Sequence, residues 1–102
     1  MKAQKLKQYL TDKLIEGKFF WSYAGVTDIP DEVLIEKVLI HLDINDIDIL
    51  FVIFPWRKIK AVWLKEIIIQ DNLYHSMNIL FAYLYFHIKK PEEYIERHIK
   101  QA

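Results

Sequence analysis

The sequence predicts an all-α fold, a single compact domain over residues 1–102 built as an irregular bundle of about five to six helices. Residues that typically end helices and form turns are few: there are only two glycines and three prolines. An all-β domain would need turn residues about every eight to twelve positions. Pro30, Pro55 and Pro91 each stand where a helix can begin, because a proline in the first turn loses no hydrogen bond.

The first predicted helix, Lys2–Glu16, has a thin apolar stripe formed by Leu6, Leu10 and Leu14. We expect Gly17 to end this helix as a left-handed cap. The core is predicted over residues 19–94, so the N-terminal helix is expected at its periphery.

The second predicted helix, Asp31–Leu42, starts with two carboxylates, Asp31 and Glu32, that complement the positive end of the helix dipole. Its aliphatic residues share one broad face, which we expect to enter the core. They are Leu34, Ile35, Val38, Leu39 and Leu42.

The segment Asp46–Phe54 is apolar on every side from Ile49 onward, and its residues fit a buried strand as well as a helix. A lone strand would leave its backbone groups without hydrogen-bond partners, and no other convincing strand is present. We therefore expect a helix, with Asp43, Asn45 or Asp46 as its N-cap.

The segment Pro55–Ile69 predicts a third central helix with a divided surface. One narrow face carries Trp56, Ile59, Trp63 and Ile67. Arg57, Lys58 and Lys65 lie on the other side. A surface on which bases stack needs aromatic and basic groups together. Core tryptophans with a solvated basic back are therefore the preferred interpretation.

Beyond the break at Gln70–Asn72, a long apolar helix is predicted, with Asp71 or Asn72 as its cap. Only a thin strip of this helix is not strongly apolar, so we expect it to be the buried centre of the domain. The strip consists of His75, Asn78, Ala82 and Lys89. Pro91 opens the last helix, with Glu92 and Glu93 in its first turn.

Charge and composition exclude several classes of function. Lys plus Arg equals Asp plus Glu at 14 each, so no global field attracts a polyanion. Cysteine is absent, which excludes disulfides and thiolate metal sites. The sequence contains neither a signal-peptide run nor a membrane span, and we expect a cytoplasmic protein.

No catalytic motif is present. The histidines His41, His75, His87 and His98 have no metal-ligand spacing, and neither serine sits in a G-x-S-x-G turn. We expect no catalytic, cofactor-binding or metal-binding residues, and no enzyme activity.

Apolar residues make up 53% of the chain, which predicts a dense core or a surface that a partner covers. The stretch "KFFWSYAG" offers both alternatives. In the preferred interpretation, its aromatic side chains pack into the core at one end of the helical bundle. Otherwise Phe19, Trp21 and Tyr23 form an exposed interface with a protein partner or a second copy.

The preferred hypothesis for the function is a non-enzymatic helical domain that acts through protein–protein contact. The alternative is DNA binding by a helix-turn-helix unit. Asp31–Leu42, Asp46–Phe54 and Pro55–Ile69 have the outline of such a unit, in which Arg57, Lys58 and Lys65 would face the phosphates. The neighbouring acids count against this reading, as does the small number of side chains able to read bases. These acids are Asp43, Asp46 and Asp48.

Residues Phe19 to about Tyr94 resemble a family of small bacterial domains of unknown function, often encoded beside abortive-infection-type nucleotidyltransferase toxins. The similar stretches are "FFWSY", "IPDEVLIEKVL", "DINDIDILF", "IKAVWLKEI" and "NILFAYLYFHIKKPEEY". The resemblance implies an all-helical fold and a role as an antitoxin-like or accessory subunit. It supplies no catalytic residues.

Overall fold

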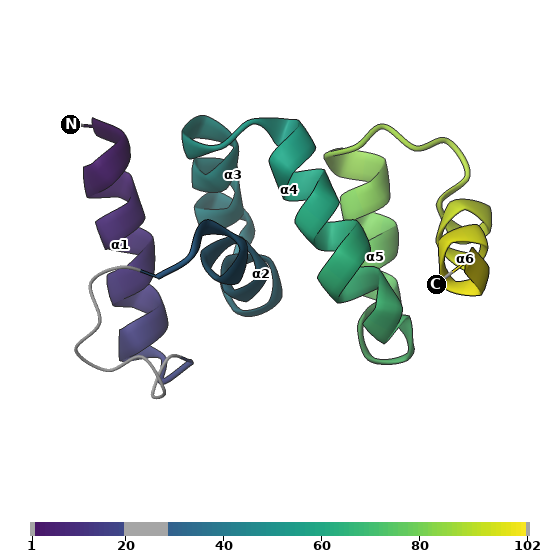
Figure 1. Ribbon diagram of the computed structural model, residues 1–102, viewed down its shortest axis with the longest axis horizontal. Helices are drawn as coiled ribbons and strands as arrows, with labels where there is room; N and C mark the ends of the chain where they lie inside the picture. Colours follow the sequence, from purple (N-terminus) through teal and green to yellow (C-terminus); the bar gives the residue numbers. More distant parts are fainter. Residues whose placement is uncertain (1, 20–28, 102) are drawn as a thin grey trace. The chain divides into compact units, whose positions relative to one another are not determined.

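The computed structural model describes residues 2–19 and 29–101, and every regular element in these two ranges is helical (Figure 1). The predicted all-α class is therefore confirmed. The chain divides into two compact units, Met1–Ile59 and Lys60–Ala102, and the boundary falls inside one helix. Each unit has its own set of packed helices.

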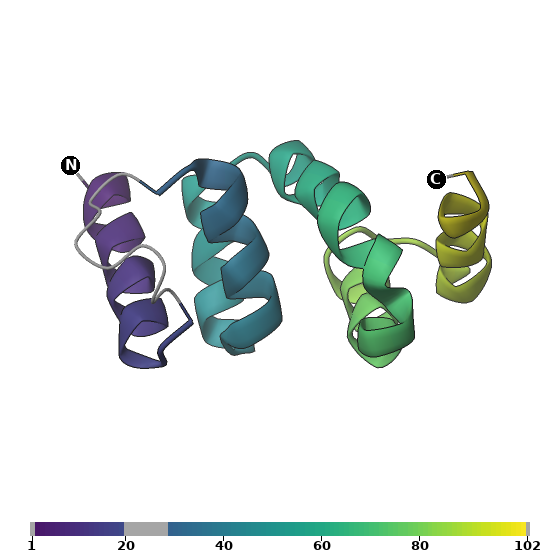
Figure 2. The ribbon, with the colours of Figure 1, turned by 60° about the horizontal axis from the view of Figure 1, so that its bottom comes forward.

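In the first unit, α1 (Lys2–Glu16), α2 (Asp31–His41) and α3 (Ile44–Ile53) pack against one another, side by side in both ribbon views (Figures 1 and 2). All three helices contribute buried aliphatic side chains. They are Leu10, Leu14, Leu34, Ile35, Val38, Leu39, Ile47 and Leu50. Helix α1 is thus an integral part of this core and not peripheral to it.

Helix α3 confirms the helical alternative for the segment that could also have been a strand. Asp43 is its N-cap: the side-chain Oδ1 of Asp43 accepts a hydrogen bond of 3.2 Å from the backbone N–H of Asp46. This bond satisfies a donor that the first turn of a helix leaves without a partner.

The side chain of Asp46 is buried, with 3% of its surface exposed, and its Oδ2 lies 3.0 Å from the Nζ of Lys13. A buried carboxylate without a counter-charge would be strongly destabilising. The hydrogen bond that Lys13 donates to Asp46 raises the pKa of Lys13, and its side-chain hydrogen bond with Tyr9 adds to the effect. This ion pair joins α1 to α3.

The end of α1 differs from the prediction in one residue. The residue with positive φ is Lys18 (φ 64°), not Gly17. The N–H of Phe19 bonds to the carbonyl of Leu14 at 2.9 Å, and that of Lys18 to the carbonyl of Ile15 at 3.0 Å, which is the Schellman pattern. Gly17 is needed for another reason: a Cβ there would lie 2.4 Å from the Phe19 ring.

The segment after Pro55 is helical but not uniformly α. It comprises α4 (Trp56–Val62), a π-helical turn (Trp63–Ile67) and a 3₁₀ turn (Ile68–Gln70). Ile59, Trp63 and Ile67 are buried as predicted. Trp56 was predicted in the core, but 51% of it is exposed. The buried aromatic residue at this end of the first unit is Phe54, which ends α3.

The second unit is formed by these turns together with α5 (Asp71–Leu84) and α6 (Pro91–Gln101). Trp63 is the centre of its core, with the Phe86 ring stacked at 4.7 Å and the Tyr94 ring at 6.3 Å between centroids. The chain leaves α5 through His87, whose positive φ of 52° lets the N–H of Ile88 reach the carbonyl of Ala82.

Two predictions for α5 are wrong. Its N-cap is Gln70 without a side-chain bond, and Asp71 turns its carboxylate to other partners. The helix is also not buried all round, because Leu73 and Tyr83 are each 68% exposed. The orientation of α5 about its own axis decides which of its apolar side chains are exposed.

Candidate functional site

Helix α5 turns an apolar face to solvent. Met77 is half-buried, while Leu80, Tyr83 and Leu84 are exposed. At 3.6 residues per turn these four positions fall within about 120° of the helix circumference. We call them the apolar face of α5. Leu73 is also exposed, but it precedes a local break in the helix at Tyr74 (φ −123°, ψ 25°).

The opposite side of α5 carries the buried residues Asn78, Phe81 and Ala82. Two of these, Asn78 and Ala82, belong to the strip that the sequence marked as least apolar. Asn78 is fully buried, and its Oδ1 accepts a hydrogen bond of 2.9 Å from the indole Nε1–H of Trp63. A buried indole N–H needs such a partner, so the polar side of the helix faces inward.

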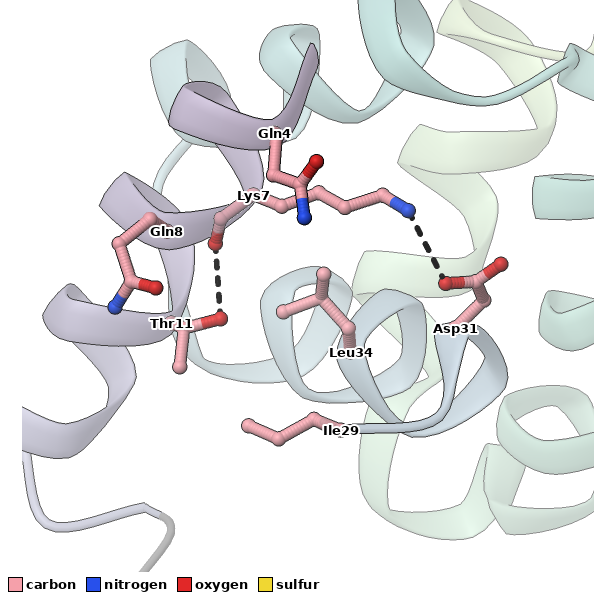
Figure 3. Close-up of a pocket in the computed structure, with 7 residues that line it drawn as sticks. All are labelled: Gln4, Lys7, Gln8, Thr11, Ile29, Asp31 and Leu34. Carbon is pink, nitrogen blue, oxygen red and sulfur yellow. Dashed lines mark hydrogen bonds and ion pairs between the residues drawn. The ribbon is translucent and has the colours of Figure 1, made fainter. Parts of the chain in front are cut away.

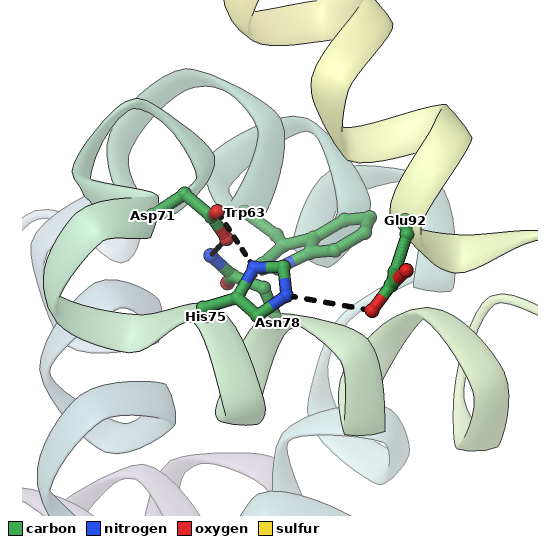
Figure 4. Close-up of polar contacts among 5 residues, drawn as sticks. All are labelled: Trp63, Asp71, His75, Asn78 and Glu92. Atoms are coloured by element: carbon green, nitrogen blue, oxygen red, sulfur yellow. Dashed lines mark hydrogen bonds and ion pairs between the residues drawn. The ribbon is translucent and has the colours of Figure 1, made fainter.

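The hydrogen bond to Trp63 also orients the rest of a polar network (Figure 4). Because Asn78 Oδ1 faces the indole, its Nδ2 faces outward and donates to Asp71 Oδ1 at 2.9 Å. The other oxygen, Asp71 Oδ2, lies 2.8 Å from the Nδ1 of His75. A carboxylate that accepts both bonds requires the proton of His75 to be on Nδ1.

His75 also connects α5 to α6, since its Nε2 lies 3.8 Å from Glu92 Oε1. Nε2 can pair with that carboxylate only when it carries a proton, so the contact belongs to the imidazolium. The hydrogen bond to Asp71 raises the pKa of His75, with a smaller contribution from Glu92. The arrangement is therefore an ion-pair clamp between the two helices.

Beside this clamp lies a hollow of about 400 Å³. Its charged groups are paired within it: His75 with Asp71 and Glu92, and Lys100 with Glu96 at 2.9 Å. The floor is apolar, formed by Ile95 and Ile99.

A second, smaller hollow of about 180 Å³ lies between α1 and the start of α2 (Figure 3). Asp31 is the one anionic residue among the described residues of its lining, and its carboxylate pairs with Lys7 at 3.5 Å and with Lys58 at 2.9 Å. The hydrogen bond from Lys58 lowers the pKa of Asp31. The hollow is lined by Gln4, Lys7, Gln8, Thr11, Ile29, Asp31 and Leu34.

The three candidate DNA-binding cations are not equivalent. Lys58 is engaged with Asp31, and its Nζ also lies 5.6 Å from the centre of the Phe54 ring. Arg57 is exposed, with its guanidinium 5.8 Å from the Trp56 ring. Lys65 is exposed on the π-helical turn. DNA binding stays a prediction. One of its three candidate cations, Lys58, is already paired with a carboxylate of the same chain.

Of the predicted protein-interface residues, Phe19 is half-buried and stacks on the ring of His41 at 4.1 Å between centroids. Burial, with a smaller contribution from Lys37, lowers the pKa of His41. Trp21 and Tyr23 lie outside the described residues. The interface predicted for this stretch is therefore untested.

The residues of the apolar face were missed at the sequence level because α5 is apolar around most of its circumference. A helical wheel identifies the polar strip but not the direction in which it points. The signal that could have located the face was the pair of Trp63 and Asn78, a buried donor and an acceptor 15 positions apart.

No protein-family model matches the chain, and neither the curated proteins nor the solved structures contain a significant match. Within residues 2–19 and 29–101, no helix is long and apolar enough to cross a membrane. In the same part of the chain, no group of three or more His, Asp or Glu side chains is placed to hold a metal ion.

The hydrogen bond between Asn78 and Trp63 predicts the effect of Asn78→Ala. The substitution leaves the indole N–H buried without an acceptor, so the free energy of unfolding should fall by about 1–3 kcal/mol, measured by urea denaturation. In a Trp63→Phe background, which has no indole donor, the same change should be less costly. Equal losses in both backgrounds would contradict a role for this bond.

The clamp predicts a pH dependence. A pKa raised in the folded state means that protonated His75 stabilises the fold fully below its ordinary pKa of about 6.5, and that this stability is lost as pH rises through the raised pKa. The difference in unfolding free energy between the wild type and His75→Gln should therefore be larger at about pH 5 than at about pH 9. Glu92→Gln should reduce this dependence, whereas a difference that grows with pH would refute the clamp.

Proposed function

We propose that the chain is a non-catalytic protein-interaction domain whose contact surface is the apolar face of α5. The observation that carries the proposal is the exposure of Tyr83, Leu80 and Leu84 on one side of a single helix. Covering apolar surface is favourable by about 25 cal/mol per Å². Contiguous apolar patches on protein surfaces commonly mark sites of protein contact.

The other exposed apolar residues support this choice by their dispersion. On α3, Ile44 and Val52 lie eight positions apart, at opposite ends of the helix. On α1, Tyr9 and Ile15 lie six positions apart, about 120° around the helix axis and about 9 Å along it. Neither helix carries more than two exposed large apolar residues, whereas α5 carries Leu80, Tyr83 and Leu84 within five consecutive positions.

Buried contacts on the inner side of α5 also hold the helix that carries the contact surface in place. Asn78 and Ala82 anchor the inner side of α5, and His75 makes an exposed contact of 3.8 Å with Glu92 of α6. A surface that is ordered before binding loses less conformational entropy when a partner arrives. A rigid helix face fits a partner that offers a groove or another helix.

The resemblance to domains encoded beside nucleotidyltransferase toxins suggests an accessory or antitoxin-like role, with an enzyme as partner. Helix-turn-helix DNA binding through Arg57, Lys58 and Lys65 is the weaker alternative. Lys58 is bound to Asp31 at 2.9 Å, and the chain as a whole has no net charge.

A pull-down with the tagged full chain from lysate of the source cells tests the proposal. Tyr83→Glu places a charge on the apolar face of α5, so a partner that docks there should be lost because burying the carboxylate is costly. Nuclease treatment before washing separates protein partners from those held through nucleic acid.

The matched control is Val52→Glu, because Val52 is 70% exposed and Tyr83 is 68% exposed. Both variants should melt within a few degrees of the wild type, since neither side chain is buried. A protein partner that binds the Tyr83→Glu variant as strongly as the wild type would refute the proposed contact surface.

A further inference from the structure

We draw no further inference here: the strongest candidate, the hollow of about 400 Å³ between α5 and α6, is a cluster of acidic side chains already paired with His75 and Lys100, and the described part of the chain holds no unpartnered buried polar group that would point to a ligand there.

Discussion

The hydrogen bond from the indole of Trp63 to the side chain of Asn78 sets the orientation of α5, and the rest of the second unit depends on it. Trp63 is fully buried and stacks with Phe86 and Tyr94, so its N–H must find an acceptor inside the protein. Asn78 supplies that acceptor at 2.9 Å. Its amide nitrogen then donates to Asp71, and the order of the network follows from these two bonds.

A consequence of this constraint is that Asn78 and Ala82 face the core while two leucines and a tyrosine of α5 face water. Hydrophobicity alone would favour the opposite rotation, since burial of a leucine contributes about 1.5–3 kcal/mol. An indole N–H buried without a partner would cost about 1–3 kcal/mol, which opposes part of that gain. The exposed side that results is the surface for which a protein partner is proposed.

The first unit uses a charged pair in a comparable way. Asp46 lies inside the three-helix core, and Lys13 reaches it from α1. The described part of the chain contains no buried side-chain nitrogen or oxygen without a hydrogen-bond partner. Each unit therefore joins one helix to another through a polar contact at its core, surrounded by aliphatic side chains in the first unit and by aromatic rings in the second.

The sequence was sufficient to predict the helices and most of their starts, because prolines and capping residues act locally. Asp43 at α3 and Pro91 at α6 are examples. It was not sufficient for features that depend on distant partners. The exposure of Trp56 depends on Phe54 being the buried ring at that end, and the rotation of α5 depends on Trp63. The positive φ falls on Lys18 because the backbone hydrogen bonds of the Schellman motif place this residue one position beyond the C-cap.

The orientation of α5 is most directly tested by thiol labelling of single-cysteine variants, since the chain has no cysteine of its own. Positions 83 and 82 are adjacent in sequence, but Tyr83 is 68% exposed and Ala82 is fully buried. In dilute, folded protein we expect Tyr83→Cys to react nearly as fast as in urea and Ala82→Cys at least about a hundredfold more slowly. Equal rates, or faster labelling at position 82, would contradict the account.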